Sequence, residues 1–308
     1  MNILYLIFNR PHLQVESFES IRRAKPAKLF IAADGPRDFR DDDQKKCEQA
    51  RRIVDQVNWK CEVNTLFRET NVGCRRAVGD AITWFFRNVE DGIVIEDDCI
   101  ASSSFFQFAE ELLKYYRDDE RVWCISGSNF QNGVKRGDGS YYFSRYNHCW
   151  GWASWRRCWV HYDDSLTLWK RAETLDIASD CFENILERDY WKSLWNGLLS
   201  PDCVIDSWAY RWSCSVVLNG GLTALPNANL VTNIGFAEDG SHCFGSSPDP
   251  GIQQFDCKLV HPSFVIRDRE ADRLTFETVF GGRPPTRLEN VKRRIRRFLP
   301  WMRPFRQL

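Results

Sequence analysis

The sequence predicts an α/β protein with a mainly parallel central sheet flanked by helices. Two observations predict this class. Short apolar stretches alternate with stretches of helical periodicity over the first 126 residues. Residues 92–95 are also apolar without interruption, as is typical of a strand buried on both faces of a parallel sheet. Parallel strands need crossover connections, which the intervening helices supply.

The elements are expected in regular order along the chain. Strands are predicted at residues 2–8, 28–33, 61–67, 92–96 and 121–126, and helices at residues 12–23, 42–57, 72–88, 104–117 and 206–218. The apolar N-terminal run is too short for a signal peptide or a membrane span, and it fits a first buried strand.

Composition excludes several classes of protein. The 42 basic and 42 acidic residues balance, so no global field favours nucleic acid as a partner. The twelve cysteines are scattered and contain no C-x-x-C pair, which disfavours a zinc module or a disulfide scaffold. No window is apolar over the length of a membrane span. We therefore expect a cytoplasmic protein with free thiols.

The sequence changes in character after residue 126. Nine of the thirteen tryptophans fall between Trp150 and Trp212, in helix-like stretches. The first four are spaced so tightly that we do not expect all of them to face one core. Tryptophan faces suit sugar rings, whereas most tryptophans belong to cores, so both roles stay open. Residues 227–262 are rich in Gly, Ser, Pro and Asn, which predicts a long mobile loop that covers or binds a ligand.

The last residues alternate basic and apolar side chains. A basic amphipathic helix at residues 286–308 would suit peripheral contact with an anionic membrane surface. An ordinary solvated terminal helix fits the same pattern equally well.

The predicted strand at residues 92–96 runs directly into three acids, Glu96, Asp97 and Asp98. Three desolvated carboxylates cost stability unless a cation or hydrogen-bond donors compensate them. Oxygen ligands on one short loop suit Mn²⁺ or Mg²⁺, and ligands bind at the carboxyl ends of strands in open α/β sheets. A solvated acidic turn before a helix is the alternative.

Four separated segments are arranged in a characteristic order. They are Phe8-Asn9-Arg10; Asp34-Gly35; the stretch from Arg75-Arg76-Ala77-Val78-Gly79 through Glu96-Asp97-Asp98 to Trp123-Cys124-Ile125-Ser126; and Asp206-Ser207-Trp208, followed by Gly235-Phe236 and Ser241-His242. Over most of residues 2–262 this order resembles glycosyltransferases of the GT-A fold. The likeness is greatest to the inverting N-acetylglucosaminyltransferase I family and its bacterial relatives.

The resemblance implies a nucleotide-sugar site and a metal. Asp98 would be the direct ligand of Mn²⁺ or Mg²⁺, which would stabilise the departing diphosphate. The residues implied to bind the nucleotide sugar are Asn9, Arg10, Asp34, Arg75, Glu96, Asp97 and His242. A UDP-sugar is the expected donor. However, Gly73 stands where eukaryotic members have a His, so the base-binding side departs from the family pattern.

An inverting transfer needs one general base for the acceptor hydroxyl. Asp206 is the first candidate. The family has two acids before this Trp, and the second one, generally taken as the base, corresponds to Ser207 here. The base is therefore Asp206 or lies elsewhere, with Glu238 and Asp239 in reserve. Capping the predicted helix at residues 206–218 would be a sufficient structural reason for Asp206.

The expected function is metal-dependent, inverting transfer of a sugar to a glycan or lipid-linked glycan, in bacterial surface-polysaccharide synthesis. Residues 1–126 would bind the nucleotide sugar, residues 127–284 the acceptor, and residues 285–308 would form the tail. A retaining GT-A transferase and a non-catalytic nucleotide-sugar- or carbohydrate-binding protein are the alternatives. A nucleotidyltransferase is disfavoured because Asn9-Arg10-Pro11-His12 contains no glycine for a phosphate loop.

Overall fold

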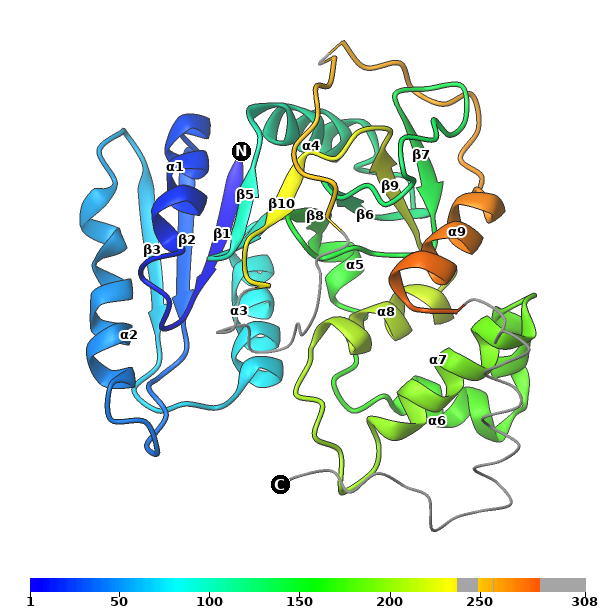
Figure 1. The fold of residues 1–308 in the computed structure, drawn as a ribbon, viewed down its shortest axis with the longest axis horizontal. Coiled ribbons are helices and arrows are strands. Elements are labelled where there is room, and N and C mark those ends of the chain that lie inside the picture. Colours follow the sequence, from blue (N-terminus) through cyan, green and yellow to red (C-terminus); the bar gives the residue numbers. More distant parts are fainter. Residues whose placement is uncertain (237–248, 257, 283–308) are drawn as a thin grey trace.

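The computed structural model describes residues 1–236, 249–256 and 258–282. Within them a central sheet has the strand order β3-β2-β1-β4-β8-β6-β9-β7 (Figure 1). Its strands are β1 (Asn2–Ile7), β2 (Lys28–Ala33), β3 (Glu62–Phe67), β4 (Asp91–Glu96), β6 (Val122–Ser126), β7 (Tyr141–Ser144), β8 (Trp152–Trp155) and β9 (Leu222–Pro226). Strands β8 and β7 run antiparallel to their neighbours, and the other pairs are parallel. The predicted α/β class and mainly parallel sheet are confirmed.

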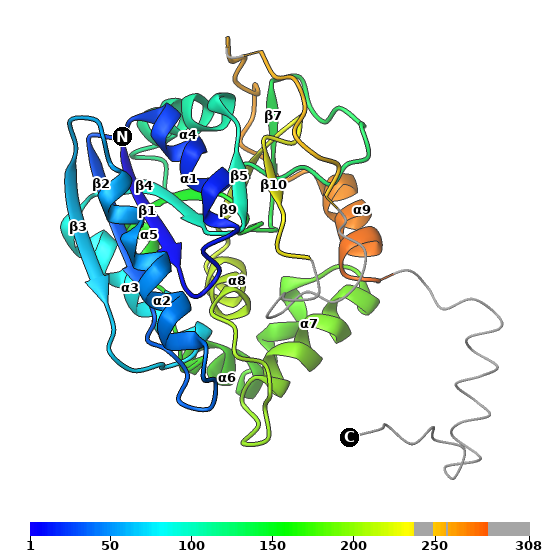
Figure 2. The ribbon, with the colours of Figure 1, turned by 60° about the vertical axis from the view of Figure 1, so that its left-hand side comes forward.

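Helices connect the parallel strands, as predicted. They are α1 (Gln14–Ala24), α2 (Asp43–Arg51) with the 3-10 helix η1 (Arg52–Gln56), α3 (Cys74–Asn88) and α4 (Ser103–Tyr115). Crossovers from β1 to β2 to β3 step in one direction, and α3 returns the chain from β3 to β4. Because such crossovers are right-handed, α3 lies on the opposite face from α1 and α2. Figure 2 shows α1 and α2 in front of β1, β2 and β3.

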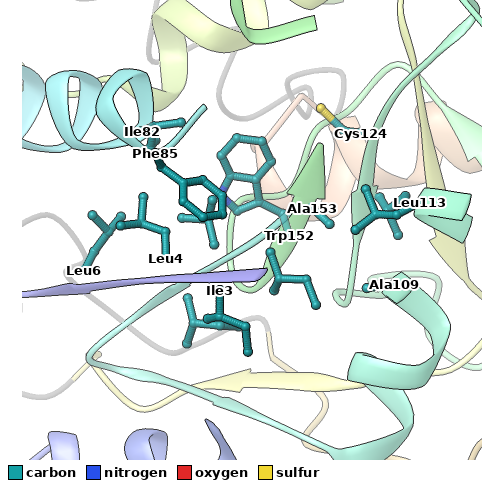
Figure 3. Packing of buried hydrophobic residues seen from close by; sticks show 14 of the residues in the cluster. Ile3, Leu4, Leu6, Ile82, Phe85, Ala109, Leu113, Cys124, Trp152 and Ala153 are labelled. Atoms are coloured by element: carbon teal, nitrogen blue, oxygen red, sulfur yellow. The ribbon is translucent and has the colours of Figure 1, made fainter. Parts of the chain in front are cut away.

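The core lies along the central strands, whose side chains alternate between two helix-covered faces. Ile3, Leu4 and Ile93 are fully buried there. Figure 3 shows side chains of α3 (Ile82, Phe85) and α4 (Ala109, Leu113) packed with Trp152 and Ala153 of β8 around β1. Burial on both faces explains why these strands are uniformly apolar in sequence.

The expectation for the tryptophans was wrong. Trp152, Trp155 and Trp159 are all buried in the core around the central sheet, and Trp150 packs against it. The reason is that Trp152 and Trp155 lie on a strand, β8, rather than on a helix. A strand inserted between β4 and β6 contacts helices on both faces, so a single core accepts closely spaced rings.

A smaller helical group holds three of the five tryptophans between residues 169 and 212. The remaining helical elements of the described residues are α5 (Arg156–Trp159), which packs in the core of the central sheet, and α6 (Thr167–Thr174), the 3-10 helix η2 (Ile177–Cys181), α7 (Ile185–Gly197), α8 (Ala209–Leu218) and α9 (Arg269–Val279). Trp169, Trp191 and Trp195 are buried in a second core formed by α6, α7, α8 and α9. Figures 1 and 2 show α6 and α7 below the central sheet.

The segment predicted as one long loop contains a short strand. β10 (Val231–Asn233) pairs antiparallel with β5 (Cys99–Ala101), which follows the acidic motif directly. Local composition did not reveal this strand because its stability comes from pairing with residues 130 positions away in the sequence. The predicted tail at residues 286–308 lies outside the described residues.

Two further observations concern the described residues only. Their ten cysteines form no disulfide bonds. None of their helices combines the length and the apolarity that a membrane span requires.

Candidate active site at the carboxyl ends of the strands

The predicted site residues follow three neighbouring strands. β1 pairs in parallel with β2 and with β4, so Ile7 lies beside Ala33 and Leu6 lies beside Glu96. The segments that begin at Phe8, Asp34 and Asp97 therefore leave the same edge of the sheet. Open α/β sheets bind their ligands at this edge.

An arginine from one of these segments pairs with acids from another. Nη1 of Arg10 donates to Oδ2 of Asp98 at 2.9 Å, and Nη2 donates to Oδ1 of Asp97. The other oxygen of Asp97 accepts from the backbone N–H of Phe8 at 3.1 Å. The Asp97 and Asp98 residues are 1% and 7% exposed, so this is a buried ion cluster.

The electrostatics of the cluster are unbalanced. Burial, followed by the repulsion of Asp98, raises the pKa of Glu96 to about 8. Burial also raises the pKa of Asp97 to about 6, although Arg10 opposes this rise. Burial opposes a charge on Arg10, but the neighbouring acids raise its pKa above the usual value. A second positive charge placed here would relieve the excess of acids.

Asp34 lies at the N-terminus of helix α3. Its carboxylate accepts from the backbone N–H groups of Gly35 at 2.8 Å and of Val72 and Gly73 at 3.1 Å. Burial raises the pKa of Asp34, and the three amides moderate this rise. Asp34 therefore joins the segment after β2 to the turn before α3.

Asp206 does not cap its own helix, which was the structural alternative to its predicted role as general base. It precedes the first residue of α8, Ala209, and its Oδ1 instead accepts from the backbone N–H of Arg75 at 3.3 Å. Gly73 makes room for it, because a Cβ there would lie 2.5 Å from Oδ2 of Asp206. The N-terminus of α3 therefore stabilises Asp206, because the helix dipole favours a negative charge there and the N–H of Arg75 has no partner within the helix.

Cys74, the first residue of α3, has a half-buried thiol. Burial raises the pKa of this thiol well above its usual value, and the negative charges of Glu96 and Asp206 raise it further. Through Gly73, the structure brings Asp206, the predicted base, next to the turn that Asp34 holds before α3.

The side chains of two predicted ligand residues contact other parts of the protein. Nδ2 of Asn9 donates to Oδ1 of Asp43 at 2.6 Å, and Asp43 is also paired with Arg37. The Arg75 side chain is 40% exposed, with Nε 3.6 Å from Oδ1 of Asp164. Their roles in nucleotide binding stay predictions.

The segment after β10 lies over Asp98. The N–H of Ile234 donates to the backbone oxygen of Asp98 at 2.8 Å, and a Cβ on Gly235 would lie 2.3 Å from Oδ2 of Asp98. Glycine is thus required for this close approach. The predicted residues Glu238, Asp239 and His242, which follow, lie outside the described residues.

The donor chemistry at this edge fits a hard divalent cation, since carboxylate oxygens are the ligands that Mn²⁺ and Mg²⁺ prefer. Glu96 has no hydrogen-bond partner among the described residues, whereas Arg10 occupies Asp98. No group of three His, Cys, Asp or Glu side chains within the described ranges is arranged around a metal position. A metal on Asp98 would therefore require Arg10 to release it.

Sequence reasoning missed the ion pair of Arg37 with Asp43, and it missed Cys74. Asp43 is the first residue of α2, where an acid is common for local reasons, so its contact with Asn9 had no distinct signal. Cys74 lies between Gly73 and Arg75, two positions that the family resemblance had already singled out. Its place between them was the available signal.

No family model matches this chain, and no curated protein matches it. Solved structures similar to it include a crystal structure of S. aureus TarS 1-349, with 12% identity, a TM-score of 0.42, and coverage of 74% of this chain and 58% of that chain. Another is the mannosyltransferase PcManGT from Pyrobaculum calidifontis in complex with GDP-Man and Mn²⁺, with 10% identity, a TM-score of 0.40, and coverage of 70% and 73%.

The inositol-1-phosphate CTP transferase from T. maritima is a third, with 9% identity, a TM-score of 0.39, and coverage of 76% and 88%. At these scores and identities the likeness concerns the general α/β arrangement alone. The resemblance to the N-acetylglucosaminyltransferase I family stays a prediction.

Proposed function

We propose that this protein is a glycosyltransferase that moves a sugar from a nucleotide-diphosphate donor to a hydroxyl of a glycan or glycolipid. The observation that carries the proposal is the convergence of Arg10, Asp34 and the acids Glu96–Asp98 at the carboxyl ends of β1, β2 and β4. A UDP-sugar as donor and inversion at the anomeric carbon are the finer parts of the proposal.

The residues have distinct parts in this proposal. Arg10 supplies a positive charge for the diphosphate, since a guanidinium binds phosphate oxygens in a bidentate manner. Glu96 has carboxylate oxygens that accept hydrogen bonds from sugar hydroxyls. Asp206 takes the proton of the acceptor hydroxyl as the general base. Its contact with α3 would hold it in place.

The proposal includes Mn²⁺ or Mg²⁺ on Asp98. When bound, such an ion would neutralise negative charge on the departing diphosphate. For this to happen, Arg10 has to release Asp98. Its guanidinium would then bind the diphosphate, which attracts a positive charge more strongly than a carboxylate that a metal has neutralised.

The test is calorimetric titration of UDP with and without Mn²⁺. Wild type is compared with Asp98→Ala and with Asp118→Ala, a control that removes an exposed acid. We expect binding that needs Mn²⁺, that Asp98→Ala weakens at least tenfold, and that the control retains. Absence of UDP binding by folded wild type would contradict the UDP-sugar donor, and absence of binding of every other nucleoside diphosphate would contradict the proposal itself.

Turnover then decides between the remaining alternatives. The anomeric configuration of the product, observed by NMR from a UDP-sugar and a lipid-linked or free acceptor, separates inversion from retention. Strong preference for a free acceptor would count against surface-polysaccharide assembly at a membrane. Binding of the donor without turnover would favour a non-catalytic nucleotide-sugar-binding protein.

A further inference from the structure

Trp150 differs from the other tryptophans between residues 150 and 212. The eight others are at most 4% exposed, whereas Trp150 is only half-buried. Its indole N–H has no hydrogen-bond partner among the described residues. Core packing therefore accounts for the eight buried rings. It does not account for the exposed part of the Trp150 ring.

The backbone brings Trp150 to the end of the strand that carries the acids. Val94 of β4 pairs with Trp152, so the antiparallel register leads two residues further to Glu96 and Trp150. Gly151 has φ +62°, and a Cβ there would lie 2.7 Å from Cγ2 of Val231 on β10. The turn at Gly151 therefore lets β10 pack closely beside Trp150.

The segment that follows β10 then reaches both Asp98 and Trp150. Gly235 lies against the Asp98 carboxylate, and the ring of the next residue, Phe236, meets Trp150 edge-on with centroids 5.2 Å apart. Phe130 packs against Trp150 in the same way, with centroids 5.6 Å apart. Two rings therefore pack against the indole of Trp150. One of them, Phe236, directly follows Gly235, which lies against Asp98.

A buried nitrogen lies beside these rings. His148 packs edge-on against Phe130, with ring centroids 4.7 Å apart. Its Nε2 is shielded from solvent and has no hydrogen-bond partner among the described residues. An unsatisfied buried polar atom costs stability, and a ligand hydroxyl or a water molecule would satisfy it.

We infer that Trp150, braced by Phe236 and Phe130, forms a platform for a pyranose ring beside the acidic motif. The inference rests on the proposed function and adds a sugar-binding surface to it. A large rigid ring accepts the C–H face of a sugar, while its N–H donates to a hydroxyl. The platform serves the donor sugar or the acceptor sugar, both of which present the same chemistry.

The test compares Trp150→Ala and Trp150→Leu with wild type. Trp84→Ala is the matched control, because Trp84 is also half-buried and packs edge-on against a Phe ring, Phe30, with centroids 5.1 Å apart. Binding of UDP, UDP-glucose, UDP-galactose and UDP-N-acetylglucosamine is measured by calorimetry with Mn²⁺. Binding of methyl glycosides in the presence of UDP is measured by saturation-transfer NMR.

For a donor platform, we expect both Trp150 variants to bind the preferred UDP-sugar about tenfold more weakly, with UDP affinity unchanged. For an acceptor platform, the variants lose the methyl-glycoside signals and keep wild-type affinity for UDP-sugars. The control keeps both. Trp150→Leu preserves apolar volume, so it tests the platform even if Trp150→Ala fails to fold.

Two outcomes would overturn the inference and leave the proposed function standing. Wild-type binding of every sugar by a folded Trp150→Leu would remove the platform and leave the proposed function intact. Equal weakening of UDP itself would mean that the ring stacks on the base instead of a sugar. If wild type binds neither UDP nor any UDP-sugar, the UDP part of the proposed function fails, and the platform for these sugars fails with it.

Discussion

Two buried acidic clusters in this molecule are built on different principles. The edge cluster consists of Arg10, Glu96, Asp97 and Asp98, at the carboxyl ends of β1 and β4. Three acids share one cation there, and Glu96 has no hydrogen-bond partner among the described residues. Burial and mutual repulsion raise the pKa values of Glu96 and Asp97.

The lobe cluster consists of Arg145, Glu187, Arg267 and Asp272, where α7 and α9 meet the end of β7. Both acids are buried and face two arginines, with Arg145 3.7 Å from each of them. Arg267 and Ser144 also donate to Asp272, and Tyr146 donates to Glu187. Burial raises the pKa of Asp272 to about 7 and raises that of Glu187 as well, but both carboxylates have hydrogen-bond donors within the protein. The difference between the clusters therefore lies in the number of cations and donors per acid.

We interpret this difference as one between a candidate ligand site and a structural joint. A cluster that satisfies itself stabilises one arrangement of helices and has little left for a ligand. A cluster with excess negative charge lowers the stability of the protein alone, and a cation or a set of donors relieves it. This imbalance, rather than acidity as such, points to the edge cluster.

The largest expected effect separates the clusters by stability. Asp272→Ala should lower the free energy of unfolding by about 3–5 kcal/mol, because it removes the buried carboxylate to which Arg145, Arg267 and Ser144 are bound. Asp98→Ala should change it by no more than about 1 kcal/mol, since lost pairing with Arg10 is offset by lost repulsion. Urea denaturation followed by tryptophan fluorescence measures both. If the two variants lost the same free energy of unfolding, the two clusters would not differ in the way described.

The second prediction concerns Asp206, the proposed general base. Asp206→Asn should lower kcat about 100-fold, because the amide cannot take a proton. The melting temperature should stay the same, since the amide oxygen still accepts from the N–H of Arg75. Steady-state release of UDP measures kcat, and Ser207→Ala serves as the neighbouring control. Full activity of Asp206→Asn would show that the base lies elsewhere.

The third prediction concerns the cation within the edge cluster. Arg10→Met removes the positive charge that occupies Asp98, so Mn²⁺ alone should bind about tenfold more tightly than it does to wild type. The signal of unbound Mn²⁺ in electron paramagnetic resonance gives the affinity directly, without nucleotide. Arg23→Met, at an exposed position of α1, is the control. Unchanged Mn²⁺ affinity would mean that Arg10 does not compete with the metal.

The smallest effect is expected at His148. This residue lies in the segment between Arg145 of the lobe cluster and Trp150, which lies beside the edge cluster. Burial lowers the pKa of His148 to about 3, below its ordinary value of 6.5. The unfolded chain therefore binds a proton below pH 6.5 that the folded protein excludes, and stability falls as the pH falls through this range. Between pH 6.5 and 5.5 the loss should be about 1 kcal/mol.

His148→Phe should remove that part of the acid sensitivity. Urea denaturation at the two pH values measures it, with His12→Phe as a control at an exposed position. An unchanged pH dependence in His148→Phe would mean that another group is responsible.

The accuracy of the sequence analysis differed between the two halves of the chain. In the first 126 residues, each predicted strand and helix corresponds to an observed element, because each contains its own apolar periodicity and connects to the next by a short crossover. In the second half, β8 was mistaken for helix. Its tryptophans lie between β4 and β6, and these partners are distant in sequence.

The same limit applies to the site residues. Arg10, Asp34 and Glu96–Asp98 could be expected at one edge because each follows a predicted parallel strand. The contact of Asp206 with the N-terminus of α3 joins residues 131 positions apart and has no local pattern. The position of Trp150 likewise depends on pairing between β4 and β8 and on close packing of β10.

The sequence by itself determined the α/β class, the order of the first strands and helices, and the acids that end β4. These follow from the periodicity of neighbouring residues, since burial on one or two faces of an element is expressed within that element. The tertiary structure alone decided which cation pairs with those acids, where Asp206 points and which tryptophan lies half-exposed beside them. These depend on long-range packing, in which the partner of a side chain is chosen by the fold and not by its neighbours in sequence.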